Sequence, residues 1–386
     1  CALDSLSQLV GDFHKPRFFD YRPELCAHGA MGVSGCMRCL DVCSTSAIRS
    51  TGEKIEVDPF LCQGCASCSL ACPTGALDFV QPSPKTLQDS LNQVLAKRAA
   101  DDEQFLVVHD AATRHLMPAL ETTGVILLEV NPLPAFSEAL IMSALLRGVS
   151  GVILVLAPVT PLQSRMLIDQ KVSELGKILS SQGVDPAALQ IAIPMDVGSA
   201  LEKLRGGLRK TPLSLAFNGG SSDGKRANFL SLVDAFVKNR QLSAPFSLPT
   251  GAAFGTVLVD AEKCTICHAC IHLCPTGALN GQLVPAPVLN FKESLCVQCD
   301  LCRAGCPEKA ISLHARFLPD AAVREASREL ASDQLVPCSN CGAPFTGQRK
   351  LAASLTLMRD HAKDMPWGIE SLCMCPGCRQ HQTMMT

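Results

Sequence analysis

The residues of this chain that are best suited to metal or redox chemistry are its cysteines, which number 22 among 386 residues. Three runs of them have the spacing C-x2-C-x2-C-x3-C and are followed by proline, at residues 62–73, 264–275 and 296–307. A fourth run, CMRCLDVCSTSAI at residues 36–48, is shorter: Val33 stands where a first cysteine would be, and Ser44 replaces the proline. Thiols this close in sequence can converge on one metal centre, whereas disulfides join more distant segments.

The distribution of the cysteines favours metal over disulfides. None occurs between Cys72 and Cys264, whereas a secreted disulfide scaffold spreads its cysteines through one small domain. Metal-bound thiolates suit a reducing compartment, most simply the cytoplasm. The sequence starts at Cys1 and not at Met, so we expect residues 1–22 to be a segment of a chain that has lost its true N-terminus; a lipid-modified mature N-terminus is the alternative.

The spacing of the complete runs suits a [4Fe-4S] cubane. Three cysteines of C-x2-C-x2-C wrap one cluster, and the fourth, which we expect to begin a short helix, reaches the neighbouring cluster. Proline then forces the chain out of the loop. Strand-like segments precede these runs (KIEVDPFLC, TVLVDAEKC and VLNFKESLC), which makes the whole unit an internal repeat. The repeat resembles the bacterial two-cluster ferredoxins, and it does so twice.

In that family the ligands cross over between the two runs, so the resemblance implies the ligands of each cluster. In a second module, residues 251–316, one cluster is expected on Cys264, Cys267, Cys270 and Cys306, and its neighbour on Cys296, Cys299, Cys302 and Cys274. In a first module, residues 23–82, one cluster is expected on Cys62, Cys65, Cys68 and Cys43.

The remaining cluster of the first module has Cys36, Cys39 and Cys72 and needs one more ligand. Cys26 is the candidate, because the glycines of ELCAHGAMGVSGC allow the chain to fold back toward Cys36. His28 is the competing ligand, since imidazole also occurs at iron–sulfur centres. The further alternatives are an open site of three ligands and a water, and a degenerate run that holds no cluster.

Residues 83–250 change in character and contain no cysteine. The apolar runs QFLVVHD, GVILLEV, GVILVLA and LQIAIP alternate with helical patterns from about residue 135 and across 162–182. Such alternation predicts βαβ units and a parallel sheet, and the pattern resembles a flavodoxin-like or Rossmann-like α/β domain. No G-x-G-x-x-G or P-loop is present. We interpret GGSSDGKR at 219–226, and the polar VHDAATRH segment with His109, Asp110, Arg114 and His115, as surface loops, and the domain as a docking surface or spacer.

The C-terminal part is expected to consist of a helical linker, residues 317–336, and a small zinc-ribbon-like tail, residues 337–386. Two C-x2-C knuckles supply four candidate metal ligands, Cys338, Cys341, Cys375 and Cys378. Cys373 is surplus. A fifth iron–sulfur centre or unligated thiols are the alternatives. The histidines nearby (His361 and His381), and His268 and His272 within a cysteine run, are interpreted as non-ligands.

Bulk composition excludes several functions. A net charge of -2 and an aromatic content of 4% give no surface for nucleic acid. The longest apolar stretch, residues 136–159, carries Glu138 and Arg147, so it predicts a buried helix followed by a strand and no transmembrane segment.

The fold class expected is therefore two α+β ferredoxin-like 2[4Fe-4S] modules flanking an α/β domain with a parallel sheet, and a Cys-rich tail. The function predicted is electron transfer through up to four [4Fe-4S] clusters, without a catalytic site of its own. The CAHGA-type loop with two such modules resembles the iron–sulfur proteins that accompany proteobacterial molybdenum formate dehydrogenases, which implies a molybdopterin oxidoreductase as redox partner. The alternatives are a flavin-containing oxidoreductase subunit and a redox-sensing or assembly protein with structural clusters.

Overall fold

The computed structural model describes residues 15–96, 104–120, 124–181, 183–207, 224–237, 244–359 and 368–385. The chain divides into two compact units. The first contains residues 1–24, 37–51 and 55–235, and the second contains residues 25–36, 52–54 and 236–386. The first expected cysteine module therefore contributes residues to both units.

The cysteine-rich part of the first unit consists of short strands and helices. Strand β1 (Phe19–Tyr21) pairs antiparallel with β6 (Leu77–Phe79), and β4 (Ile48–Ser50) pairs antiparallel with β5 (Ile55–Val57). The helices are α1 (Arg38–Asp41) and α2 (Ser67–Ala71), and a 3₁₀ turn η2 (Pro23–Leu25) follows β1. Strand β5 is the strand predicted before Cys62.

The rest of the first unit is built on a parallel sheet. Its strands are β7 (Phe105–His109), β8 (Val125–Glu129), β9 (Gly151–Val155) and β10 (Leu189–Ala192), in the order β10-β9-β7-β8. All three pairings are parallel. Each strand lies in one of the four apolar runs, so the predicted parallel sheet is confirmed.

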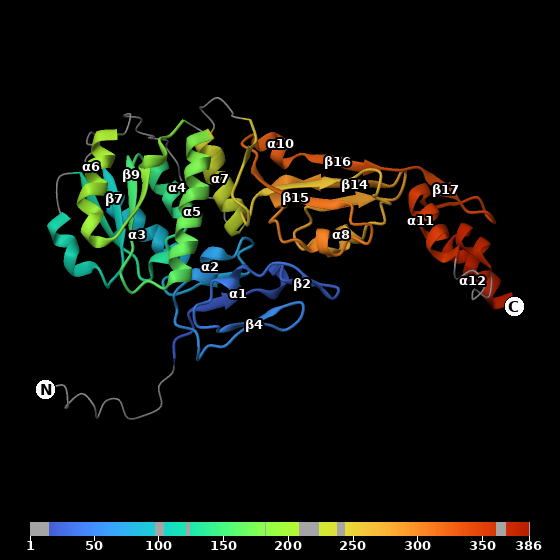
Figure 1. Cartoon of the computed structure of the whole chain (residues 1–386), viewed down its shortest axis with the longest axis horizontal. Helices are drawn as coiled ribbons and strands as arrows, with labels where there is room; N and C mark the ends of the chain where they lie inside the picture. Colours follow the sequence, from blue (N-terminus) through green and yellow to red (C-terminus); the bar gives the residue numbers. More distant parts are fainter. Residues whose placement is uncertain are drawn as a thin grey trace. The chain divides into compact units, whose positions relative to one another are not determined.

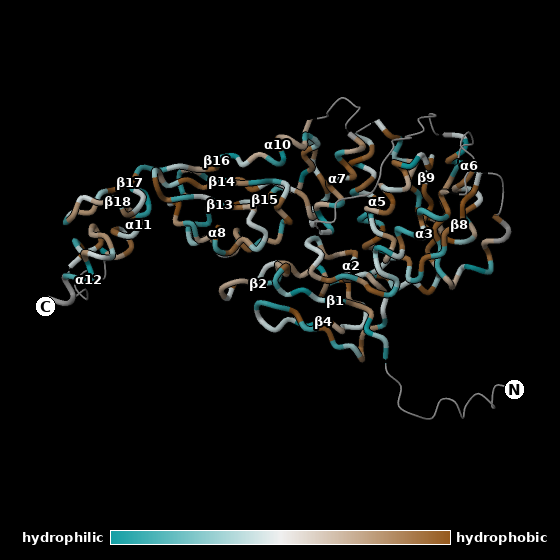
Figure 2. Tube along the Cα trace, turned by 180° about the vertical axis from the view of Figure 1, so that it is seen from behind, coloured by the Kyte–Doolittle hydropathy of each residue, from teal (hydrophilic) through white to brown (hydrophobic). Residues whose placement is uncertain are grey.

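Helices cover this sheet, as Figure 1 shows around β7 and β9. They are α3 (Pro84–Ala96), α4 (Glu138–Leu146), α5 (Leu162–Ser181), α6 (Val197–Gly207) and α7 (Lys225–Val237), with 3₁₀ turns η3 (Arg114–Leu120), η4 (Leu133–Ala135), η5 (Pro186–Ala188) and η6 (Pro194–Asp196). Side chains alternate across a strand, so Ile153 and Val155 pack with Leu201 and Leu204 of α6. Hydrophobic residues run along β8 and β9 in Figure 2.

The second unit contains two antiparallel three-stranded sheets. One has the order β11-β15-β12, with β11 (Phe246–Ser247), β15 (Ile311–Phe317) and β12 (Gly255–Val259). The other has the order β13-β14-β16, with β13 (Leu279–Gln282), β14 (Val288–Lys292) and β16 (Ser327–Ser332). Short helices carry the cysteine runs: α8 (Ala269–Leu273) and α9 (Leu301–Ala304), with η7 (Glu293–Leu295) before the latter. Strands β12 and β14 are those predicted before Cys264 and Cys296.

Three smaller parts complete the second unit. Strand β2 (Gly29–Ala30) and strand β3 (Val33–Ser34) form a hairpin. Strand β17 (Leu335–Pro337) and strand β18 (Pro344–Gly347) form another hairpin. It is followed by α11 (Gln348–Met358), η9 (Ile369–Cys373) and α12 (Pro376–Met385).

Two predictions about helices are wrong. The helical linker at residues 317–336 contains only the five-residue helix α10 (Ala321–Glu325), because Ser327–Ser332 form β16 and complete the sheet of the second module. The fourth cysteine of a run does not begin a helix: Cys72 and Cys274 follow the last residues of α2 and α8. The short helix therefore contains the third cysteine, Cys68 or Cys270, and ends just before the fourth.

The apolar stretch at residues 136–159 forms the buried helix α4 and strand β9, as predicted. Over the part of the chain that the structure describes, no helix is both long and apolar enough to cross a membrane.

The central strand β9 supplies a test of the middle core. Ile153 is fully buried, so we expect Ile153→Ala to lower the free energy of unfolding by about 2–5 kcal/mol, through lost burial and the cavity left behind. The measurement is urea unfolding of the cluster-loaded protein, followed by far-UV circular dichroism. Val159→Ala, at a side chain that is 78% exposed, is the control and should stay within about 0.5 kcal/mol of the parent. Equal losses in both variants would contradict this placement of the core.

Candidate iron–sulfur and metal sites

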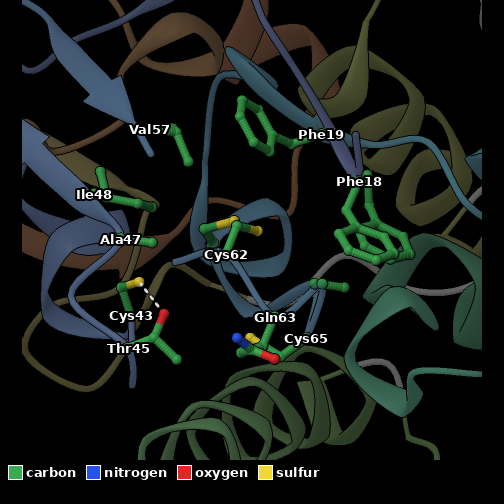
Figure 3. Close-up of a pocket in the computed structure, with 14 residues that line it drawn as sticks. Phe18, Phe19, Cys43, Thr45, Ala47, Ile48, Val57, Cys62, Gln63 and Cys65 are labelled. Carbon is green, nitrogen blue, oxygen red and sulfur yellow. Dashed lines mark hydrogen bonds between the residues drawn. The ribbon is translucent and has the colours of Figure 1, made fainter. Parts of the chain in front are cut away.

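The first unit holds a pocket formed by four cysteines and apolar side chains, shown in part in Figure 3. The four are Cys43, Cys62, Cys65 and Cys68. Burial, followed by the neighbouring Cys65, Cys62 and Cys43, raises the pKa of the Cys68 thiol to about 12. Four thiols that repel one another's charge in an apolar pocket fit a cationic metal cluster, because only a cation stabilises all of them as thiolates. Cys43 thus lies with Cys62, Cys65 and Cys68, as expected from ligand crossover.

The fourth cysteines of the four runs share two kinds of polar contact, each of which is present in three runs. A threonine two residues later places its hydroxyl 3.6–3.7 Å from the cysteine sulfur in three runs: Thr45 beside Cys43, Thr74 beside Cys72 and Thr276 beside Cys274. A backbone N–H also donates to the sulfur in three runs: Leu77 to Cys72, Leu279 to Cys274 and Ala310 to Cys306. Cys43 therefore has the local environment of a ligand although Ser44 stands where the other runs have proline.

The second module brings together two sets of thiols. Burial, followed by Cys267, Cys264 and Cys306, raises the pKa of Cys270 to about 12. Burial also raises the pKa of Cys302, with Cys296, Cys299 and Cys274 as the next causes. Each set has three cysteines from one run and the fourth from the other, which is the crossover that the resemblance implies.

The loops of the complete runs have left-handed residues at the same places. The second residue after the first cysteine and the second residue after that have positive φ in every run: Gly64 and Ala66, Ile266 and His268, Gln298 and Asp300. Non-glycine residues in this region cost free energy, and such strain persists only where the surroundings impose it. The repetition in three loops fits a common cluster that the loops must wrap.

The ring of His268, in a cysteine run of the second module, is already engaged in a hydrogen bond to the backbone. His268 Nε2 lies 3.1 Å from the carbonyl oxygen of Val288, and burial lowers the pKa of its imidazole. A neutral ring that donates Nε2–H to a carbonyl supports the interpretation of His268 as a packing residue.

The fourth run takes its geometry from the β2–β3 hairpin. Backbone N–H groups of Gly35 and Cys36 donate to the carbonyls of His28 (2.7 Å) and Ala27 (3.0 Å). The predicted fold-back of the glycine loop is thus confirmed, and it places Cys26 at the open end of the hairpin next to Cys36. Cys26 is buried, and the competitor His28 has Nδ1 2.9 Å from the Cys36 carbonyl oxygen. Ligation by Cys26 stays a prediction.

The same hairpin lies against α9 within the second unit. A Cβ added to Gly35 would be 2.5 Å from Leu301 Cγ and 2.9 Å from the Cys299 carbonyl oxygen. Cys36 is also one of the thiols that contribute to the raised pKa of Cys299, after burial. Residues 25–36 therefore bring Cys36 next to the second module.

The tail gathers its four predicted cysteines. The sulfurs of Cys338, Cys341, Cys375 and Cys378 lie within 4.8 Å of one another. The Cys341 and Cys375 sulfurs are 3.8 Å apart, and the Cys375 N–H donates to the Cys338 sulfur at 3.2 Å. Backbone N–H groups of Cys375 and Cys341 lower the pKa of Cys338 to about 6, so this thiol is ready to bind a cation. Zn–S bonds of about 2.3 Å around a tetrahedron give sulfur separations of about 3.8 Å.

The tail differs from the predicted ribbon in its surroundings. The first knuckle lies between β17 and β18, and the second lies at the start of helix α12. The surplus Cys373 is outside the four-sulfur group, and its carbonyl accepts the Ser339 N–H. His381 is exposed on α12, whereas His361 lies outside the described residues.

The polar residues at the carboxyl end of β7 are used within their own loop. Asp110 accepts the Thr113 N–H at 3.2 Å, and Arg114 pairs with Glu129 through two nitrogens. His109 Nδ1 lies 3.1 Å from the Asp110 carbonyl oxygen. These contacts support a structural loop.

Sequence reasoning missed Lys225. It belongs to GGSSDGKR, interpreted as a surface loop, of which residues 219–223 lie outside the described part. Lys225 is the first residue of α7, and its ammonium reaches the backbone beside the ligand candidate Cys72. A sequence gives no signal for a contact between residues 153 positions apart.

Crossover in the first module is testable by thiol protection. We expect Cys43→Ser to expose Cys62, Cys65 and Cys68 to alkylation in the purified, anaerobic protein, because their shared cluster loses a ligand. Mass spectrometry of the alkylated peptides reads each cysteine, and Cys373→Ser is the control that should expose none of them. Continued protection of Cys62, with loss of protection at Cys36 and Cys39, would contradict crossover. It would show that Cys43 binds the same cluster as Cys36 and Cys39.

Comparison with known proteins supports the cluster assignment. Residues 34–76 match a family model described as a 4Fe-4S dicluster domain, and residues 263–311 match a second family model with the same description. No curated protein matches the chain. The two matched segments contain the cysteine runs described above. The chain thus contains two segments that match 4Fe-4S dicluster ferredoxin domains, which supports iron–sulfur clusters at both pairs of cysteine runs.

Proposed function

We propose that this protein relays single electrons through up to four [4Fe-4S] clusters to or from a redox enzyme. The observation that carries the proposal is the gathering of thiols in crossed sets, three from one run and one from the other, in both modules. Each cluster, when bound, takes up and releases one electron. The residues of this chain exclude water from it and donate N–H groups to its ligand sulfurs, which tune its potential.

The fourth cluster is proposed on Cys26, Cys36, Cys39 and Cys72. Its support is the β2–β3 hairpin, which pairs the backbones of Ala27 and Cys36 and so brings the neighbouring Cys26 to the same place. The environment of the Cys72 sulfur, with the Leu77 N–H and the Thr74 hydroxyl, repeats that of Cys274 in the second module.

One relay through both modules is favoured over two separate ones. Cys36 lies close enough to Cys299 to raise its pKa, and a Cβ added to Gly35 would lie 2.9 Å from the Cys299 carbonyl oxygen. A cluster held by Cys36 would therefore be the neighbour of the cluster held by Cys299. Electrons that enter one pair of clusters could then leave from the other.

The proposed partner is a molybdopterin oxidoreductase such as a formate dehydrogenase. It rests on the resemblance of the CAHGA-type loop, residues 26–30, to the iron–sulfur proteins that accompany such enzymes. Anaerobic mixing of the reduced protein with an oxidised formate dehydrogenase tests it: oxidation of the clusters within the turnover time of that enzyme is expected, and no oxidation would remove this partner.

The number of clusters can be counted. Four cubanes predict about 16 irons and about 16 acid-labile sulfides per chain of anaerobically purified protein. In Cys26→Ala we expect about four irons fewer, because the cluster of the shortened run loses its fourth ligand. His28→Ala is the matched control and should keep the iron of the parent. A parent with about 12 irons, unchanged in Cys26→Ala, would show that the shortened run holds no cluster.

We propose that the tail binds one Zn²⁺ on Cys338, Cys341, Cys375 and Cys378. The support is the sulfur spacing, because each thiolate of a cubane binds a different iron and the four must lie farther apart than around one ion. Metal analysis is expected to find about one zinc per chain, lost in Cys375→Ser without loss of iron. Cys373→Ser is the control and should keep the zinc. Loss of about four irons in Cys375→Ser would instead identify a fifth cluster.

A further inference from the structure

The middle α/β domain places a cation at the end of the helix that leads to Cys72. Helix α2 ends at Ala71, so its last carbonyls have no partner within the helix. The Lys225 ammonium donates to the carbonyl oxygens of Leu70 (3.1 Å) and Cys72 (2.9 Å), and also to that of Ser69. A side chain from α7 thereby binds the backbone of a cluster-ligand candidate.

The number of acceptors fixes the charge of this group. Three carbonyl oxygens around one nitrogen require three N–H donors, which an ammonium has and a neutral amine does not. Glu138 of α4 and the Cys72 thiol also act electrostatically on this ammonium. The carbonyl contacts and the nearby carboxylate together hold the positive charge in place.

Buried ion pairs in the same unit contribute to the electrostatic surroundings of Lys225. Lys171 lies between two carboxylates, 3.1 Å from Glu138 and 3.4 Å from Glu174. The pKa of Glu138 is lowered, because Lys171 and Lys225 together outweigh its burial. Glu138 therefore stays ionised; it pairs directly with Lys171 and acts on Lys225 at longer range.

The middle domain also meets α2 through a second buried polar contact. The hydroxyls of Ser67 in α2 and Ser164 in α5 lie 2.7 Å apart, and both side chains are buried. With Lys225, this contact ties the helix that carries Cys68 and leads to Cys72 to the parallel-sheet domain. The domain is thus part of the cluster surroundings and is more than a spacer.

We propose that Lys225 is a positioning residue that raises the reduction potential of the cluster ligated by Cys72, which gives the middle domain a role in setting the order of the relay. The proposal rests on the proposed function, because it requires a cluster at Cys72. Reduction adds one electron to that cluster, and a fixed cation nearby in a low-dielectric surrounding stabilises the reduced form more than the oxidised form.

The test is an EPR-monitored redox titration of Lys225→Met, which keeps the length of the side chain and removes its charge. One cluster should shift to a more negative midpoint potential, and the signal that shifts should be the one absent from Cys26→Ala. Lys225→Arg should restore most of the shift. Lys177→Met, the same charge change at an exposed position of α5, is the control and should shift none.

A second variant tests the same inference in case Lys225→Met loses iron. Glu138→Gln removes a buried anion at constant shape and should move the same cluster in the opposite, positive direction. Unchanged potentials in both variants, with the iron content of the parent, would overturn the inference and leave the proposed function intact. Equal shifts of all clusters would also overturn it. A parent without a cluster at Cys72, shown by its iron count, is a failure of the proposed function instead.

Discussion

The structure depends on bringing four thiolates into one small apolar volume. Burial and the neighbouring sulfurs raise the pKa of Cys68, Cys270 and Cys299 to about 12, so without a cation these groups remain neutral thiols at neutral pH. A bound iron cluster reverses this balance and releases protons as it binds. The same thiols that repel one another's charge therefore become the strongest links within each module. The modules have short strands and helices of four or five residues, and cluster binding contributes to their folding.

The loops and their hydrogen bonds follow from that constraint. To wrap a cluster within seven residues, each complete run takes up positive φ at two positions, including non-glycine residues such as Ala66 and His268. Each such residue costs on the order of 1–3 kcal/mol, which ligation must offset. N–H groups then point at the sulfurs, as Leu77 and Leu279 do. Ligand spacing, backbone strain and sulfur hydrogen bonding are three consequences of one geometric requirement.

The sequence predicted the parts in which local pattern decides the structure. The strands of the middle sheet follow from continuous apolar runs, and the crossed grouping of the thiols was expected from the resemblance to the two-cluster ferredoxins. The helical linker was wrong because a mixed-charge segment with good helix formers, at residues 327–332, pairs with β14 through tertiary contacts that override propensity. Lys225 was missed for the same reason: its partners, Ser69 and Leu70, lie about 155 positions away, and no local signal marks them.

The shortened run differs from the complete runs in its backbone conformation. Met37 has φ of -111°, so the run lacks the left-handed residue that the complete runs have at the equivalent place. The β2–β3 hairpin instead bonds Cys36 to Ala27 and holds Cys26 beside it. A Cβ at position 35 would clash with Leu301 and with the Cys299 carbonyl. Packing against the second module therefore requires glycine at this position. If Cys26 supplies the fourth ligand, as we propose, the hairpin serves two purposes at once: it brings Cys26 toward Cys36 and it packs Gly35 against the second module.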